Sequence, residues 1–382
     1  MRLIIAPDKF KGSMSAREAA VMIAEGVKTV YPEADTIMLP LSDGGEGLVD
    51  TLVSGRNGLF QESIVTGPLG KKVKARWGLI DQGKTAVIEM AEASGLALVP
   101  EELRNPSLTT TYGTGELIKA ALDKNCSRLI IGIGGSATND GGAGMARALG
   151  AVFNDKEGQE LREGGAALLN LEQIDISQID GRIKNAKFIV ASDVDNPLTG
   201  PQGASFTYGP QKGATPQMAK LLDQALSRFA AVVKKDLGCD LTKVKGAGAA
   251  GGLGAGLIAF LDAELQPGLD LVLNQLKFNS LMHGCSLVIT GEGKLDQQSL
   301  HGKVPIGVAI RSCKFKVPVL ALTGALLADS SELHKAGITA AFAIADGPLS
   351  VEESIKRGPE LLKRKTEELM YLWKAAAKSV SS

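Results

Sequence analysis

Residues 129–150 read LIIGIGGSATNDGGAGMARALG, an apolar run followed by a loop with six glycines and then by a helical pattern. Short β-branched runs of this kind recur along the chain, and each leads through a glycine-rich or acidic loop into a helical pattern. These runs lie at residues 3–6, 36–41, 188–191, 287–290 and 319–323. Near-continuous apolar strands that alternate with helices are typical of a parallel sheet buried on both faces. The sequence therefore predicts an α/β protein, in which ligands bind at the carboxyl ends of strands.

The glycine loop itself carries few side chains, and most of those are polar. Successive backbone N–H groups in such a loop are free to form an anion-binding concavity. A structural turn needs fewer glycines, so we interpret the loop as a phosphate-binding cradle. It is not a P-loop, because the chain has no GxxxxGK[ST] motif. The candidate nucleotide-binding residues are Gly134, Gly135, Ser136, Asn139, Asp140 and Gly141.

Two further strand-end loops near the start of the chain contain charged residues. In PDKFKG, Asp8, Lys9 and Lys11 precede a helix, which fits either an anion site or an exposed basic loop. In SDGGEG, Asp43 and Glu46 have the spacing of a helix capping box. The same pair could also bind a hydroxyl group or Mg²⁺, since hard cations take oxygen ligands.

The loop TGEGKLDQQSLHGKV combines acids with lysines after the apolar run LVIT. Glu292 and Asp296 could hold Mg²⁺, and Lys303 could neutralise phosphate, as phosphoryl transfer requires. A solvated charged loop is the alternative. Asp193 follows another apolar run, FIVAS, and is a candidate general base or Mg²⁺ ligand.

A literal GxGxxG motif occurs at Gly246, Gly248 and Gly251. The dinucleotide fingerprint requires a strand directly before it, and the preceding CDLTKVK is a poor strand. Tight packing, or close approach of the backbone to a ligand, is therefore the preferred interpretation.

Composition narrows the class of partner. Lys plus Arg and Asp plus Glu both number 42, so no net charge favours nucleic acid or an anionic membrane. No segment approaches the roughly 18 apolar residues of a membrane span. The four cysteines form no CxxC pair, which fits a reducing compartment. We expect a cytoplasmic protein that acts on small molecules, and the sequence does not fix its oligomeric state.

The pattern along the chain predicts two domains. Ser15 and Glu18 form a capping box for a helix that ends near Pro32, and residues 350–382 favour one further helix. Residues 62–80 alternate like a hairpin with Gly70 at its turn, which indicates entry into an inserted domain. We predict a first domain over residues 1–62 and 281–382, and an inserted domain over residues 63–280.

Together these loops resemble the bacterial glycerate kinases of the two-domain α/β type. The matching stretches include APDKFKGSMSA, LPLSDGGEG, EMAEASGLALVP, IIGIGGSATNDGGAGMARALG, NPLTGPQGASFTYGPQKGA, GAGAAGGLGAGL and VITGEGKLDQQSLHGKVPIGVA. They cover most of the chain, in the order typical of the family. One departure is Lys9, which stands where the family usually has serine.

The resemblance implies ATP-dependent phosphorylation of D-glycerate to 2-phosphoglycerate with Mg²⁺. It also implies a Rossmann-like domain with a second, inserted α/β domain and an active site in the interdomain cleft. We expect Asp193, Asp296 and Lys303 to be catalytic, and Asp193 and Glu292 to bind Mg²⁺. The expected substrate-binding residues are Asp8, Lys9, Lys11, Asp43 and Glu46. A kinase for another small hydroxy acid, or a nucleotide sensor without turnover, remains the alternative.

Overall fold

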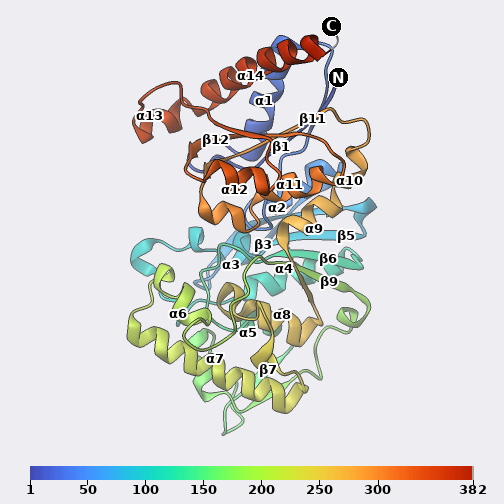
Figure 1. Cartoon of the computed structure of the whole chain (residues 1–382). Coiled ribbons are helices and arrows are strands. Elements are labelled where there is room, and N and C mark those ends of the chain that lie inside the picture. The colour runs from blue at the N-terminus through green and yellow to red at the C-terminus, as the bar shows by residue number, and fades with distance from the viewer. Residues whose placement is uncertain (381–382) are drawn as a thin grey trace. The chain divides into compact units, whose positions relative to one another are not determined.

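A computed structural model describes residues 1–380, with side chains described for residues 1–300 and 302–377. Contacts between Cα atoms divide the chain into two compact units. The first unit comprises residues 1–43 and 269–382, and the second comprises residues 44–268. In Figure 1 the first unit is blue and orange to red, and the second runs from cyan to yellow. The second unit is therefore an insertion within the first.

The first unit is built on a five-stranded parallel sheet within the described residues, in the order β13–β12–β11–β1–β2. The strands are β1 (Arg2–Pro7), β2 (Asp35–Met38), β11 (Leu287–Leu295), β12 (Val319–Leu326) and β13 (Ala340–Ala343). From β1 the chain continues to β2 on one side, and from β11 it continues to β12 on the other side. The boundary between β1 and β11 is thus a topological switch point, where ligands bind in open α/β sheets.

Helices cover both faces of this sheet. Helix α1 (Ala16–Val30) begins with the expected capping box between Ser15 and Glu18, and its buried stripe includes Ile23 and Val27. It packs beside α14 (Gly358–Val380) in one core with the sheet, whereas α11 (Val304–Cys313) contacts β1, β11 and β12. The remaining helices of this part of the chain are α9 (Gly268–Gln275), α10 (Phe278–Leu281), α12 (Ser330–Lys335) and α13 (Val351–Lys356).

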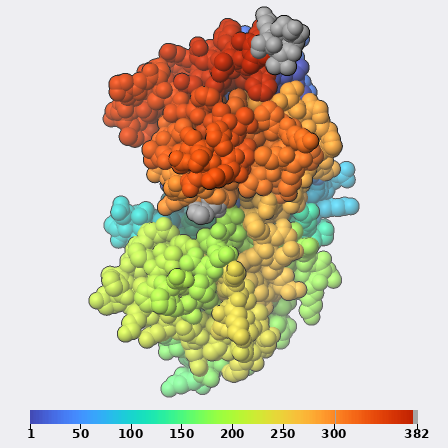
Figure 2. All heavy atoms as spheres, viewed as in Figure 1, coloured from blue at the N-terminus to red at the C-terminus, as the bar shows by residue number. Residues whose placement is uncertain are grey.

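The C-terminal segment differs from the single helix expected over residues 350–382. It forms two helices, α13 and α14, and Ser350 caps the first by accepting the backbone N–H of Glu353 at 3.1 Å. Pro359 explains the break, because its nitrogen cannot donate to a preceding helical turn but fits the first turn of a new helix. The red segment in Figure 2 lies on the surface, and Tyr371 and Leu372 of α14 are exposed. Residues 381–382 lie outside the described part.

The second unit contains a six-stranded mixed sheet in the order β10–β9–β6–β5–β4–β3, together with a small β7–β8 pair. The strands are β3 (Leu59–Thr66), β4 (Lys72–Ile80), β5 (Thr85–Glu89), β6 (Arg128–Gly132), β7 (Val152–Asn154), β8 (Gln173–Asp175), β9 (Lys187–Ala191) and β10 (Glu264–Gln266). Strands β5, β6, β9 and β10 run parallel. The expected hairpin is confirmed as β3–β4, with Gly70 at φ +79° between the strands.

Helices again cover this sheet on two sides. They are α2 (Leu48–Gly55), α3 (Ala91–Ser94), α4 (Tyr112–Asp123), α5 (Ala143–Ala148), α6 (Ala204–Tyr208), α7 (Pro216–Leu237) and α8 (Leu253–Leu261). Residues of α4, α5, α7 and α8 form one core with alternate residues of the strands, including Trp77 and Phe188. Helix α2 contacts β4 and β5, and its residues lie outside that core.

The units change over at residues 43/44 and 268/269, and not at the expected 62/63 and 280/281. The physical reason for the first difference is the packing of α2. Its residues Val49 and Val53 lie against Gly78 of β4, so the segment before the hairpin already belongs to the second sheet. Near the second changeover, Leu269 packs against Gly307 of α11 and so belongs to the first unit.

In the part of the chain that the structure describes, no helix combines the length and apolar character needed to cross a membrane.

Candidate functional site

Asp8 and Glu292 emerge together at the switch point of the first sheet. Pro7 of β1 is in register with Gly291 of β11, and the backbone N–H of Asp8 donates to the Gly291 carbonyl at 2.8 Å. The parallel register thus brings two carboxylates that are distant in sequence to one sheet edge. This is where the α/β architecture places a ligand site.

Asp8 is the most strongly perturbed carboxyl group of this edge. Burial, followed by the charge of Asp43, raises the pKa of Asp8 to about 7, although the backbone N–H of Lys9 opposes the shift. That N–H donates to Asp8 Oδ1 at 2.7 Å. A carboxyl group that titrates near neutral pH is suited to accept a proton during a reaction.

The other substrate-binding candidates lie at different depths. Lys9 is partly buried, whereas Lys11, Asp43 and Glu46 are exposed. Backbone hydrogen bonds from Leu39 to Ile5 and from Leu41 to Pro7 carry the chain alongside β1 after β2 ends. This path explains how Asp43 reaches the electrostatic range of Asp8. Glu46 belongs to the second unit, so the SDGGEG loop crosses the boundary between the units.

The capping-box alternative for this loop is wrong. Helix α2 has Gly47 as its N-cap, without a side-chain hydrogen bond at the cap. The backbone N–H groups of Gly47 and Val49 instead donate to the carboxylate of Glu89, at 3.2 and 2.8 Å. Glu89 ends β5 and is buried, and burial raises its pKa. Sequence reasoning missed this residue, because only the fold brings β5 to the start of α2.

Glu292 and Lys303 face each other across the loop after β11. Lys303 Nζ lies 3.6 Å from Glu292 Oε2, and the side chain of Glu292 is only 7% exposed. Burial raises the pKa of Glu292, opposed by Ser299 and Lys303. Its second oxygen, Oε1, is buried and has no hydrogen-bond partner among the described residues. A buried carboxylate oxygen without a donor fits a cation ligand.

Asp296 has a clear local role. Its Oδ1 accepts the backbone N–H groups of Gln298 and Ser299, so it caps the short helix η9 (Gln297–His301). The hydrogen bond from Lys294, at 2.9 Å, lowers the pKa of Asp296. These contacts already satisfy the carboxylate of Asp296, so no ligand is needed to explain its position. The catalytic role of Asp296 stays a prediction.

The glycine loop follows β6 in the second unit, and only its first part is accessible. Gly134 and Gly135 are exposed and Ser136 is 7% exposed, whereas the loop from Ala137 to Gly141 is buried. Backbone hydrogen bonds fix the exposed part on both sides, from Leu96 to Gly135 at 2.8 Å and from Ala137 to Ser94 at 2.9 Å. A ligand on this loop would therefore meet a preorganised backbone at 134–136.

Asn139 and Asp140 point into the protein. Asp140 is 1% exposed, and its carboxylate accepts hydrogen bonds from Thr111 and from the backbone of Gly142 and Gly144. Asn139 is fully buried and donates to Ser205 Oγ at 2.9 Å. Both residues shape the loop from within, and their contact with nucleotide stays a prediction.

Lys212 is a second residue of interest, besides Glu89, that sequence reasoning missed. It closes the 3₁₀ turn η6 (Pro210–Lys212), is 1% exposed and points beneath the glycine loop. Its Nζ donates to Ser136 Oγ at 2.6 Å and to the Thr138 carbonyl at 2.7 Å. The only signal in the sequence was its place between glycines in GPQKGA, which does not indicate burial.

The GxGxxG motif supports the loop by close packing. It follows the short η7 (Leu241–Lys243), so no strand leads into it as a dinucleotide fingerprint would need. Gly251 has φ +68°, and a Cβ placed there would lie 2.0 Å from the Thr138 carbonyl oxygen. Only glycine permits this contact, which confirms the packing interpretation.

Asp193 lies after β9, at the carboxyl end of the second sheet. It is exposed, and its Oδ1 accepts the backbone N–H of Gly268 at 2.8 Å. Its position at a strand end is the one expected for a catalytic or metal-binding carboxylate. Its role as base or Mg²⁺ ligand stays a prediction.

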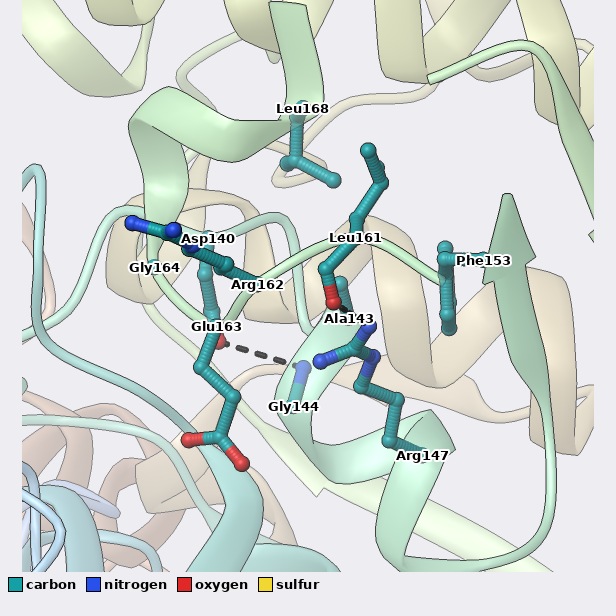
Figure 3. A pocket seen from close by; sticks show the side chains of 10 residues that line it. All are labelled: Asp140, Ala143, Gly144, Arg147, Phe153, Leu161, Arg162, Glu163, Gly164 and Leu168. Atoms are coloured by element: carbon teal, nitrogen blue, oxygen red, sulfur yellow. Dashed lines mark hydrogen bonds between the residues drawn. The ribbon is translucent and has the colours of Figure 1, made fainter. Parts of the chain in front are cut away.

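A small pocket lies behind the glycine loop, between α5 and residues 161–164 (Figure 3). Arg147 projects into it, donates to the Leu161 carbonyl and pairs with Glu160 at 3.3 Å. Asp140 borders the pocket while it is bonded to the backbone of Gly144. The lining is Asp140, Ala143, Gly144, Arg147, Phe153, Leu161, Arg162, Glu163, Gly164 and Leu168. These contacts engage Arg147 with protein groups, so the pocket is a weaker ligand site than the exposed loop.

No group of three or more His, Cys, Asp or Glu side chains suited to a metal ion is found among the described residues. Mg²⁺ in phosphoryl-transfer sites usually takes only one or two carboxylates, with substrate phosphates and water completing its shell. The donor set at Glu292 is compatible with that mode of binding.

A family model and several known proteins match nearly the whole chain. Residues 3–374 match the model of the glycerate kinase family. A protein named glycerate kinase from Bacillus subtilis strain 168 is 52% identical over 97% of both chains. A protein named glycerate 2-kinase from Escherichia coli strain K12 is 50% identical over 93% of both chains. The crystal structure of a candidate glycerate kinase 2 from Salmonella typhimurium LT2 is 45% identical, covers 99% of both chains and has a TM-score of 0.90.

Proposed function

The chain belongs to the glycerate kinase family and is a kinase, and we propose that it phosphorylates D-glycerate to 2-phosphoglycerate with ATP and Mg²⁺. One observation carries this proposal. The Escherichia coli relative named glycerate 2-kinase is 50% identical over 93% of both chains, and similarity over nearly the full length supports the same reaction. The strand-end loops described above supply the groups that such a reaction needs.

The acceptor is bound, in this proposal, by the loops at the switch point of the first sheet and by the neighbouring SDGGEG loop. Lys9 and Lys11 attract the carboxylate of glycerate, and Asp43 and Glu46 bind its hydroxyl groups. Asp8 accepts the proton of the attacking hydroxyl. Its raised pKa, about 7, supports that role, because a base that titrates near the working pH transfers protons most effectively. Asp193 and Asp296 are the other candidate carboxylates.

The nucleotide is bound, in this proposal, by the glycine loop of the second unit. The exposed backbone at Gly134 and Gly135 and the hydroxyl of Ser136 contact the phosphates. Asn139, Asp140 and Gly141 contribute by holding the loop in shape, since they are buried. Preorganised donors stabilise developing charge without reorganising during the reaction.

Glu292 fits a Mg²⁺ ligand on chemical grounds, because one of its oxygens is buried without a donor. Asp193 is the second carboxylate that we propose for the ion. When bound, Mg²⁺ would neutralise part of the negative charge on the phosphates.

In the transfer step, the acceptor oxygen forms a bond to the γ-phosphorus while the bond from that phosphorus to the β–γ bridging oxygen breaks. The hydroxyl proton passes to the carboxylate base, and ADP leaves. Lys303 offsets charge on the transferring group, and its neighbour Glu292 keeps its ammonium in place at 3.6 Å.

A ³¹P NMR time course with ATP, Mg²⁺ and D-glycerate tests the proposal. We expect a new phosphomonoester signal that couples to the C2 proton. Coupling to the C3 protons would overturn the proposed position. Intact ATP would overturn the proposed substrate, and the same assay with other small hydroxy acids would then separate a different kinase from a nucleotide sensor.

A further inference from the structure

Lys212 is a buried cation that the proposed reaction does not yet use. Its side chain enters the protein from η6 and ends beneath the accessible part of the glycine loop. Two of its three N–H donors are engaged, one by Ser136 Oγ at 2.6 Å and one by the Thr138 carbonyl at 2.7 Å. The lysine therefore connects a second segment of the chain to the loop at two residues, Ser136 and Thr138.

Burying an ammonium group is costly unless it is well paired. The charged group that acts on Lys212 electrostatically is Asp140, which itself accepts hydrogen bonds from Thr111, Gly142 and Gly144. Burial outweighs Asp140 and lowers the pKa of Lys212 to about 7. A site that served stability alone would favour an apolar side chain of the same length here.

The direction of the hydrogen bonds is informative. Because Lys212 Nζ donates to Ser136 Oγ, it occupies a lone pair of that oxygen, and the Ser136 hydroxyl proton is left to donate elsewhere. Ser136 lies next to the exposed backbone of Gly134 and Gly135. A phosphate oxygen on that backbone would be the acceptor.

We propose that Lys212 is a positioning residue for the nucleotide phosphates: it orients the Ser136 hydroxyl as a donor, fixes the Thr138 carbonyl and adds positive charge beneath the loop. This inference rests on the proposed nucleotide role of the loop and adds a residue to it. A bound polyanion favours the protonated form of Lys212, so nucleotide binding takes up a proton at neutral and alkaline pH.

The test is nucleotide binding, measured with a fluorescent N-methylanthraniloyl derivative of ATP and Mg²⁺. The variants are Lys212→Met, Ser136→Ala, their combination, and Lys220→Met as the control. Lys220 is an exposed lysine of α7, so its substitution removes the same charge from the same unit. We expect Lys212→Met to raise the Kd and the KM for ATP about tenfold or more, with the KM for glycerate and Lys220→Met unchanged.

The combined variant should bind no more weakly than the weaker single variant, because Lys212 acts through Ser136. The Kd of the wild-type protein should rise between pH 8 and 10, where phosphate groups keep a constant charge, and the Kd of Lys212→Met should not.

Binding by Lys212→Met within twofold of the wild type would overturn the inference while leaving the kinase proposal intact. If Lys212→Met does not fold, a wild-type Kd that is flat over this pH range would overturn it. Failure of the wild type to bind the nucleotide would overturn both proposals.

Discussion

The carboxylate of Asp140 accepts both the backbone N–H and the hydroxyl of Thr111, each at 2.8 Å. Asp140 lies in the glycine loop, whereas Thr111 is the N-cap of α4. One side chain thus fixes the loop to a neighbouring helix from inside the protein.

We expect Asp140→Asn to destabilise the chain by about 2–4 kcal/mol, because an amide cannot accept all of these bonds and leaves buried donors unpaired. Urea unfolding monitored by circular dichroism measures this change. Asp123→Asn is the control, since it removes only a surface ion pair with Arg182 and should cost less than about 1 kcal/mol. Equal stability of the two variants would contradict the structural role of Asp140.

Asp8→Asn should lose activity and gain stability at alkaline pH. In the folded chain the pKa of Asp8 is raised from 3.8 to about 7, so the unfolded chain binds fewer protons across this interval. The contribution of Asp8 to stability therefore falls as the pH rises through this window. We expect the variant to be more stable than the wild type by roughly 2–4 kcal/mol at pH 8, and about equally stable at pH 4.

Its kcat should fall at least about a hundredfold, the usual effect of losing a general base. Denaturant unfolding at both pH values and steady-state kinetics supply the measurements, with the exposed Asp35→Asn as the control. Unchanged kcat would exclude Asp8 as the base of the proposed mechanism. Unchanged stability at pH 8 would show that folding does not raise the pKa of Asp8.

Gly251→Ala should disturb the glycine loop, whereas Gly238→Ala should not. The two positions have similar backbone angles, φ +68° and φ +72°, so the conformational cost of a side chain is matched. At Gly251 the new Cβ meets the Thr138 carbonyl oxygen, and at Gly238 it meets nothing within 4 Å. We expect only Gly251→Ala to raise the KM for ATP severalfold. If both variants behave alike, packing of this motif against the loop has no influence on the nucleotide.

The variants Asp193→Asn and Asp296→Asn distinguish a catalytic role of each carboxylate from a purely structural one. A catalytic carboxylate should cost at least about a hundredfold in kcat when it is replaced. Loss of a helix cap alone should cost about 1 kcal/mol of stability, with little change in kcat. Asp296 caps η9, so a loss of stability with little change in kcat would show that its role is structural and not catalytic. Near wild-type turnover in both variants would exclude them from the reaction.

Glu292→Gln should raise the Mg²⁺ concentration required for half-maximal activity by about tenfold, because it removes a charged oxygen ligand. A titration of activity with Mg²⁺ at saturating ATP measures this shift. The exposed Glu33→Gln is the control for the change in net charge. If the Mg²⁺ requirement is unaltered, Glu292 is not a Mg²⁺ ligand, and its role is limited to the ion pair with Lys303.

The sequence determined the class of fold and the family, because these depend on local patterns that survive without knowledge of contacts. Apolar runs alternating with helical stripes predicted the parallel sheets, and the hairpin around Gly70 and the cap at Ser15 follow from turn and capping chemistry. The domain boundaries were less predictable. The packing of α2 against β4 decided the first of them, and no local signal records that contact.

The sequence predicted only part of the candidate site, because local patterns do not record tertiary contacts. Glycines and charged residues marked the loops at Asp8, Ser136 and Glu292, since strand ends are where ligands bind. Burial and register were decided by the tertiary structure alone. They place Asp8 beside Gly291, turn Asp140 inward and bring Lys212 beneath Ser136. Desolvation and hydrogen bonding depend on residues that are distant in sequence, so the chemistry of these side chains is fixed only once the chain has folded.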